Sequence, residues 1–354
     1  MTTRPEDQLL SAVSGLFSAR MIPTLTDQLA RWRETKPLDG VRVLDATPLF
    51  FNTCLKYAAL LAAGADLTVA YSDHLPYSGQ ALSLLKNAGI TTLFNAFENA
   101  TGETFDVVVD CGALHKEMNT KYGAAELTRT GVDPYIATGK NVFLTDSGRV
   151  KMIETCLGTG ESCLRALKHC GYPVFADKKV LLFGGGKVGR GIKMYFQRAG
   201  ALVDLVDGNV PGAVDHRDTA TVVALAEEAD FIVSATGIRH AHHVYAPELA
   251  RTDAVIVNMG VEDEYGPAMP ENRVLNRKKT LNFLLDEPTR TCYIDPTMAL
   301  HNEAVLVLLK TPPGTGVVLP GEKLENTILD LVRNAGLIGD EVDEMLQTIC
   351  SQGE

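Results

Sequence analysis

Three glycines with dinucleotide-binding spacing are the residues of clearest chemical meaning in this chain. Gly184, Gly186 and Gly189 follow a run of four apolar residues in the pattern G-x-G-x-x-G, and Lys187 and Val188 lie between the last two glycines. In a strand–turn–helix unit, the first glycine permits the turn and the second lets backbone N–H groups approach a pyrophosphate. The third lets helix and strand pack closely. The helix N-terminus adds donors and partial positive charge, so the spacing predicts a dinucleotide site.

An acidic residue in the next predicted strand discriminates between dinucleotides. Asp207 ends the largely apolar run 201–206, 18 residues after Gly189. A carboxylate at this point can accept hydrogen bonds from both ribose hydroxyls of adenosine and would repel a 2′-phosphate. The sequence therefore favours NAD over NADP. The alternative is a sheet that merely looks like a dinucleotide fold.

The elements around this turn predict an α/β protein with two doubly wound, Rossmann-like domains. The chain has 354 residues, enough for two cores. Apolar runs alternate with helical periodicity, which is typical of parallel sheets flanked by helices. Strands are expected at 41–45, 66–70, 90–94, 105–110, 231–237 and 254–260. Gly158 and Gly160 predict a break between two helices, and with it a hinge.

Composition narrows the class of partner. The formal charge is −11, with no basic block, which argues against nucleic acid and anionic membranes. Seven irregularly placed cysteines suit free thiols in a reducing cytosol. The first 20 residues lack the basic region of a signal peptide, and no run of 18 apolar residues occurs. We expect a cytoplasmic protein that acts on a small molecule.

Over nearly its whole length, the sequence resembles the adenosylhomocysteinases. The segment 36–40, K-P-L-D-G, is similar to the K-P-L-x-G turn of that family, and 128–132, T-R-T-G-V, to its T-T-T-G-V. The pair 146–147 is similar to the N-D-S that opens the family's catalytic helix. Residues 184–191 match its G-x-G-x-V-G-x-G at every fixed position. The resemblance implies a substrate domain, 1–157 plus 296–354, with an NAD domain, 158–295, inserted between.

Most positions that contact substrate in that family carry other residues here. The family's catalytic lysine falls on Val150, beside Lys151, and its helix aspartate falls on Glu154. Its first-strand histidine, its D-D-G-G aspartate, the glutamate before T-T-T-G and the N-I-G-H histidine fall on Pro48, Cys111, Leu127 and Val261. The lysine and tyrosine of the family's C-terminal tail are missing, so we expect a homodimer rather than the family's tetramer.

Because the cofactor motif is kept while the substrate positions differ, we expect an NAD-dependent oxidoreductase for a different substrate. That substrate would be small and polar, either amino-acid-like or nucleoside-like. Two alternatives stay open. One is a lyase or hydrolase that oxidises a nucleoside or thioether transiently, as the family does, and the other is an NAD-binding sensor without catalysis.

Five residues are candidates for catalysis. Lys151 and Glu154, three apart on one predicted helix face, can act as base and orienting partner, or form a surface ion pair. Arg129 can clamp a carboxylate, or be a solvated loop residue. His240, or His242 near it, can titrate near neutrality and move a proton. The resemblance adds His301 as a substrate contact.

Further cofactor contacts are expected at the ends of later strands. Thr236 and Gly237 follow the strand beside the expected nicotinamide. The resemblance adds a set of cofactor contacts: Asn258, Gly260, Thr128, Thr130 and Asn302. Asn258 can instead hydrogen-bond only to backbone. The acidic run 262–264 is expected to be a solvated loop, and no metal is expected because the histidines at 240–243 lack a cysteine or acid at ligand spacing.

Overall fold

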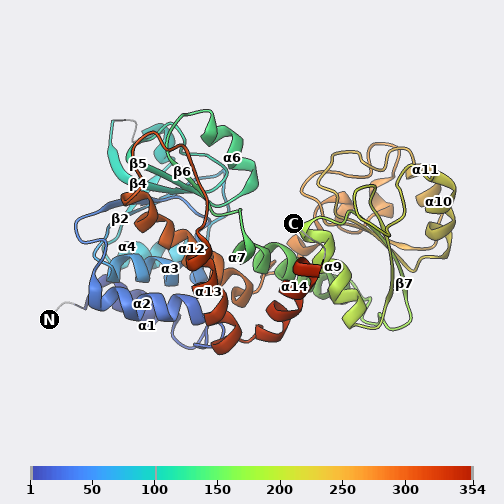
Figure 1. Ribbon diagram of the computed structural model, residues 1–354, viewed down its shortest axis with the longest axis horizontal. Coiled ribbons are helices and arrows are strands. Elements are labelled where there is room, and N and C mark those ends of the chain that lie inside the picture. Colours follow the sequence, from blue (N-terminus) through green and yellow to red (C-terminus); the bar gives the residue numbers. More distant parts are fainter. Residues whose placement is uncertain (1–2, 100–101, 352–354) are drawn as a thin grey trace. The chain divides into compact units, whose positions relative to one another are not determined.

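The computed structural model describes residues 3–99 and 102–351, and the chain divides into two compact units (Figure 1). Unit 1 comprises Met1–Lys151 together with Thr291–Glu354, and unit 2 comprises Met152–Arg290. The second unit is thus an insertion in the chain of the first. The predicted boundaries, 157/158 and 295/296, lie a few residues further along the chain in both cases.

Unit 1 is built on a seven-stranded, all-parallel sheet with the order β11-β6-β5-β4-β1-β2-β3. Strand β1 lies between β4 and β2 and is parallel to both, so the carboxyl ends of these three strands lie at the same edge of the sheet. The strands are β1 (Arg42–Asp45), β2 (Asp66–Tyr71), β3 (Thr91–Phe94), β4 (Thr104–Asp110), β5 (Asn119–Glu126), β6 (Val142–Leu144) and β11 (Val317–Val318).

Helices cover this sheet. Helix α12 packs against β4, β5 and β6 and against α2 and α3, and α6 packs against β5 and β6 (Figure 1). The helices of unit 1 are α1 (Pro5–Val13), α2 (Pro23–Thr35), α3 (Phe51–Ala62), α4 (Gly79–Asn87), α5 (Ala96–Asn99), α6 (Arg129–Ile136), α12 (Thr291–Leu309), α13 (Glu322–Ala335) and α14 (Gly339–Ser351), with α7 (Arg149–Met152) at the boundary.

Unit 2 is built on a four-stranded parallel sheet with the order β10-β9-β7-β8. Side chains of β7 alternate between two cores. Val180 and Leu182 pack with α8 and α9, whereas Leu181 and Phe183 pack with α10 and α11. Both faces are therefore buried, as in a doubly wound sheet. The strands are β7 (Lys179–Phe183), β8 (Leu202–Val206), β9 (Phe231–Ser234) and β10 (Val255–Asn258).

The helices of unit 2 differ from the sequence prediction at one point. They are α8 (Thr159–His169), α9 (Lys187–Arg198), α10 (Thr219–Glu228) and α11 (Ala246–Leu249), with 3₁₀ turns η2 (Glu271–Arg273), η3 (Leu275–Lys278) and η4 (Leu281–Leu284). A π-helical segment, η1 (Ile153–Gly158), runs directly into α8, so the predicted break at Gly158 and Gly160 is wrong.

The glycines in this region serve close packing between helices. A Cβ on Gly160 would lie 2.5 Å from the carbonyl of Gly191, and one on Gly191 would lie 1.8 Å from the carbonyl oxygen of Cys156. The absence of side chains lets α9 approach η1 and α8 at backbone distance.

The described residues also answer two questions raised by composition. No helix among them is long and apolar enough to cross a membrane. The six cysteines whose side chains are described are all free thiols.

Candidate functional site

The glycine turn after β7 has a different environment at each of its three glycines. Gly184 has φ +95°, and a Cβ there would lie 2.5 Å from the carbonyl oxygen of Ala235. A Cβ on Gly189 would lie 1.8 Å from the carbonyl oxygen of Gly184, whereas one on Gly186 would meet nothing within 4 Å. The first glycine thus makes the turn, the third packs helix on strand, and the second borders open space.

Helix α9 begins at this open space. Gly186 is its N-cap, and no side chain caps the helix. Gly186 and Lys187 are exposed, Val188 is half-buried, and Gly189 is buried. An N-terminus without a side-chain cap leaves backbone N–H groups and a partial positive charge directed at an anion, the arrangement that suits a pyrophosphate.

Asp207 stands directly after β8 and is tied to the same turn. Its Oδ2 accepts a hydrogen bond from the backbone N–H of Gly185 at 2.8 Å, and Oδ1 accepts one from the N–H of Asn209 at 2.8 Å. Each carboxylate oxygen has two lone pairs, so both can still accept a ribose hydroxyl. The two backbone hydrogen bonds therefore fix the position of the carboxylate and leave it able to accept further hydrogen bonds.

Glu264 holds the turn that follows β9. It is fully buried and accepts hydrogen bonds from the N–H of Thr236 at 2.9 Å, the Thr236 hydroxyl at 2.8 Å and the N–H of Gly237 at 2.7 Å. Gly260 packs over it, since a Cβ there would lie 2.0 Å from Oε1 of Glu264. The expectation of a solvated acidic loop is wrong for Glu264, because these donors stabilise a buried carboxylate.

Ser234 and His242 extend this network into the core. The Ser234 hydroxyl donates a hydrogen bond to Glu264, and Nε2 of His242 lies 2.6 Å from the Ser234 oxygen. We therefore assign the imidazole proton to Nε2. Burial lowers the pKa of His242 to about 3, so titration near neutrality is wrong for this histidine.

His240 has a different environment. It is half-buried with φ +56°, and its N–H donates to the carbonyl of Asp263 at 2.8 Å. Its role in proton transfer stays a prediction. The described residues contain no cluster of three or more His, Cys, Asp or Glu side chains that could hold a metal ion.

Asn258 is fully buried, and its side-chain amide forms hydrogen bonds to backbone groups. Its Nδ2 donates to the carbonyls of Glu262 at 2.8 Å and Lys278 at 2.6 Å, and its Oδ1 accepts from the N–H of Gly260 at 3.1 Å. These bonds shape the loop that carries Glu264. Direct contact between Asn258 and cofactor stays a prediction.

In unit 1, the predicted cofactor contacts Thr128 and Thr130 lie at the start of α6. Their hydroxyls are 3.1 Å apart, and Thr128 donates its hydroxyl to buried Glu126 at 2.8 Å. Arg129 is exposed, with an Nη1 3.4 Å from a carboxylate oxygen of Asp133. The predicted roles of Arg129 in binding a carboxylate and of Thr128 and Thr130 in binding the cofactor therefore stay predictions.

His301 and Asn302 lie in the interior of unit 1, on α12. His301 bonds through Nε2 to the carbonyl of Ala125 at 3.0 Å, and Asn302 donates to the side chain of Gln28 at 2.9 Å. Burial, and then the charge of Lys56, hold the pKa of His301 well below its usual value. His301 is thus a neutral imidazole, and its substrate role stays a prediction.

Lys151 and Glu154 lie on either side of the boundary between the units. Lys151 is only 3% exposed, so it does not form the ion pair at the surface that was the alternative reading. Glu154 is half-buried. Glu154 belongs to the π-helical segment, where the spacing of side chains around the axis differs from that of an α-helix. The prediction that an i,i+3 pair shares one α-helical face therefore does not apply directly.

Comparison with known proteins adds to these features. No family model matches the sequence. The adenosylhomocysteinase of Pyrococcus abyssi is 26% identical over 276 residues, covering 68% of this chain and 64% of that protein. That of Aeropyrum pernix is 25% identical over 301 residues, covering 76% and 72%. The S-inosyl-L-homocysteine hydrolase of Methanopyrus kandleri is 26% identical over 271 residues, covering 68% and 63%.

This chain is a divergent relative of the adenosylhomocysteinases. It spans about 64% of the length of the Pyrococcus adenosylhomocysteinase. The motif that carries the resemblance, G-x-G-x-V-G-x-G, lies in unit 2. Of the positions at which the resemblance breaks down, Pro48, Cys111 and Leu127 lie in unit 1 and Val261 lies in unit 2.

Two solved structures show weak likeness. A dipicolinate synthase structure from Bacillus halodurans covers 78% of this chain and 99% of its own, with 12% identity and a TM-score of 0.48. The transhydrogenase of Sinorhizobium meliloti covers 79% and 99%, with 15% identity and a TM-score of 0.46. The fold assignment therefore rests on the two parallel sheets of this chain.

Sequence reasoning missed Glu264 and Ser234 as parts of the site. Ser234 ends an apolar strand, and Glu264 follows the end of the neighbouring one. Polar residues at adjacent carboxyl ends of a parallel sheet were the available signal.

Proposed function

We propose that this chain is an NAD-dependent enzyme of the oxidoreductase type, which transfers a hydride to or from a small polar substrate that is amino-acid-like or nucleoside-like. One observation carries the proposal: the glycine turn after β7 borders open space at Gly186, and the carboxylate of Asp207 is anchored to that same turn. A fold that only looked like a dinucleotide domain would have no need of both features.

The residues fit NAD at three points. The N-terminus of α9 suits the pyrophosphate, Asp207 suits the adenosine ribose, and the turn at Thr236 and Gly237 suits the nicotinamide end. Asp207 would repel the 2′-phosphate of NADP. When bound, NAD supplies the ring carbon that accepts or donates hydride.

Hydride transfer also needs a group that takes or gives a proton. His301 is a weak candidate for this role, because burial lowers its pKa well below the usual value. Lys151, Glu154 and His240 are the remaining candidates for the acid or base, and Arg129 is the candidate for orienting a carboxylate. We propose that the enzyme works as a homodimer in the cytoplasm.

A second candidate function is a hydrolase or lyase that oxidises its substrate only transiently. The names of the relatives favour it, since they are adenosylhomocysteinases and an S-inosyl-L-homocysteine hydrolase. In such an enzyme the redox state of NAD is the same before and after turnover.

Nicotinamide fluorescence of the NAD-loaded protein tests the proposal. Panels of hydroxy acids, amino acids, nucleosides and nucleoside thioethers are offered in turn, with Asp207→Ala as the matched control. Net NADH formation supports the dehydrogenase, and product formation without net NADH supports the transient mechanism. If NAD stays bound and no panel member changes the fluorescence or is converted, the chain is an NAD-binding sensor and the enzyme proposal is wrong.

A further inference from the structure

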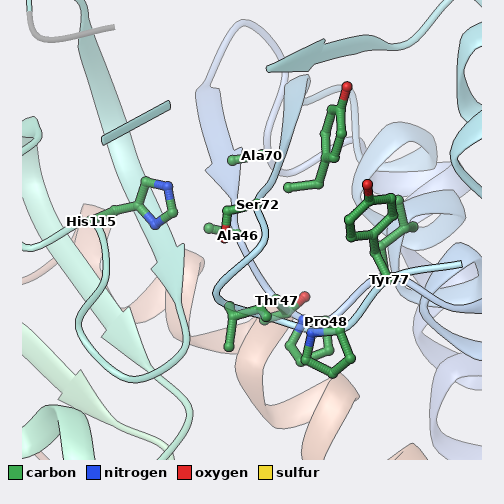
Figure 2. Close-up of a pocket in the computed structure, with 11 residues that line it drawn as sticks. Ala46, Thr47, Pro48, Ala70, Ser72, Tyr77 and His115 are labelled. Atoms are coloured by element: carbon green, nitrogen blue, oxygen red, sulfur yellow. The ribbon is translucent and has the colours of Figure 1, made fainter. Parts of the chain in front are cut away.

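A small pocket opens in unit 1 at the carboxyl ends of β1 and β2 (Figure 2). The pocket is lined by residues 46–49 after β1, residues 70–72 at the end of β2, the segment 75–77 and His115. Its enclosed volume is about 10 Å³, close to the space that one water molecule needs. Carboxyl ends of parallel strands are where α/β sheets bind ligands.

His115 brings an unsatisfied polar atom to this pocket. The residue is 3% exposed, and its Nε2 is buried with no hydrogen-bond partner among the described residues. Figure 2 shows its ring directed toward Ala46 and Ser72. A buried ring nitrogen without a partner destabilises a fold unless a ligand or water satisfies it.

The protonation of the ring follows from its other nitrogen. Nδ1 of His115 lies 3.1 Å from Oδ1 of the fully buried Asp110. That carboxylate also accepts from the N–H of Cys111 at 2.9 Å, the N–H of His115 at 2.8 Å and the hydroxyl of Tyr135 at 2.7 Å. Four donors fill its four acceptor positions, so Nδ1 carries the proton and Nε2 is an acceptor.

The loop that carries His115 is fixed from both sides. Glu126, at the end of β5, accepts from the N–H groups of Gly112 and Ala113, each at 2.9 Å. The ring of Phe97 lies edge-on to His115, with centroids 5.6 Å apart. The imidazole is therefore held in one orientation before any ligand arrives.

The charge of the pocket selects the ligand. None of the residues that line it is Lys, Arg, Asp or Glu, so nothing there pairs with a carboxylate, phosphate or ammonium. Tyr71 and Tyr77 pack edge to face, with centroids 5.2 Å apart, and supply aromatic surface. A neutral ligand with an O–H donor satisfies Nε2 without leaving a charge unpaired.

We propose that this pocket binds a small neutral polyol, with one of its hydroxyls donating to Nε2 of His115. Asp110 and Tyr135 are positioning residues that fix the tautomer and orientation of the ring. As a substrate site the pocket rests on the function proposed above and suits the uncharged hydroxyls of a nucleoside-like substrate, not an amino-acid-like one, whereas binding at His115 stands without that function. Because the volume is about 10 Å³, the lining must move outward to admit a ligand larger than water.

Histidine-selective ¹⁵N NMR of the full chain tests this assignment. The probes are glycerol and ribose, with propionate and ethylamine as charged comparators. The His115 resonances, identified by their loss in His115→Gln, should show the Nδ1–H tautomer and shift saturably with at least one polyol. The comparators should cause no saturable shift. His216→Gln, at an exposed histidine of unit 2, is the matched control and should leave the shifts unchanged.

Two further variants keep the test decisive. Tyr135→Phe retains the buried ring and removes one bond to Asp110, and it should weaken polyol binding at least about twofold. Asp207→Ala should leave the polyol shifts intact, and Tyr135→Phe should leave NAD affinity intact, so either proposal can fail alone. The Nε2–H tautomer, no saturable shift with either polyol, or a larger response to propionate or ethylamine would overturn the proposal.

Discussion

At Gly189 a methyl group would lie 1.8 Å from a backbone oxygen, whereas at Gly186, three residues earlier, it would meet nothing. Both glycines belong to the same turn, but only at Gly189 does the packing of the fold exclude a side chain. A Cβ at Gly186 would contact nothing within 4 Å among the described residues. This is the space that the proposed pyrophosphate needs in order to approach the backbone.

This difference predicts opposite effects for two alanine substitutions. Gly189→Ala should destabilise unit 2 by about 3 kcal/mol, because backbone atoms must move to admit the methyl group. Gly186→Ala should leave the unfolding midpoint nearly unchanged and weaken NAD binding roughly tenfold or more, because the methyl group occupies the approach to the phosphates. Thermal unfolding and calorimetric titration measure the two effects. Equal losses of stability in both variants would contradict this account.

Residues of the site differ in how far sequence alone could find them. The glycines and Asp207 carry a spacing that has a known physical cause, and the structure places them around one turn. Glu264 sits in an acidic run that is typical of a solvated loop, and only the fold shows that donors from Thr236 and Gly237 surround it. His115 has no motif, because its partner Asp110 and its loop are defined by the sheet.

At the scale of elements, the sequence predicts most of the strands that are apolar throughout, but it missed the short strands β6 and β11. Strand β5 was missed because its first half, N-T-K-Y-G, is polar and contains a glycine, although its second half is fully buried. The C-terminal segment forms two helices, since Gly336 ends α13. Local pattern cannot show such features where burial by distant segments decides the conformation.

Helix α2 offers a prediction about pH. Asp295, on α12, accepts hydrogen bonds from the N–H groups of Thr24 at 2.9 Å and Leu25 at 3.0 Å in the first turn of α2. Burial raises the pKa of Asp295 to about 7. Between about pH 4 and 7 the folded state therefore holds a proton that the unfolded state releases, so this residue lowers stability as pH rises through that range.

Asp295→Asn should remove this dependence. Relative to the wild type, its stability should improve by about 2 kcal/mol between pH 5 and pH 8. Urea unfolding followed by the fluorescence of Trp32, which is the only tryptophan and lies buried in α2, measures the change. Asp133→Asn, at an exposed site, is the control. Parallel pH profiles for wild type and Asp295→Asn would show that Asp295 is not protonated in the fold.

At the scale of the whole molecule, the chain contains two units with separate sheets and cores. Trp32 belongs to unit 1, while the glycine turn and Asp207 belong to unit 2. The two units can therefore be followed by different signals.

NAD should stabilise the two units unequally. At a concentration of 100 times its Kd, NAD should add about 2.7 kcal/mol to the stability of unit 2. Far-ultraviolet circular dichroism, which reports both units, should show a transition that shifts with NAD, while the Trp32 transition shifts less. Equal shifts in both signals would show that the units unfold as one or that NAD contacts both.

The affinity of the purified chain for NAD, measured by calorimetry, tests the central claim most directly. The account predicts that NAD binds more tightly than NADP, and that Asp207→Ala lowers NAD affinity roughly tenfold or more through loss of the ribose hydrogen bonds. Asp204→Ala, at an exposed position in β8, should have no effect. Absence of NAD binding, or equal affinity in the wild type and Asp207→Ala, would contradict the account.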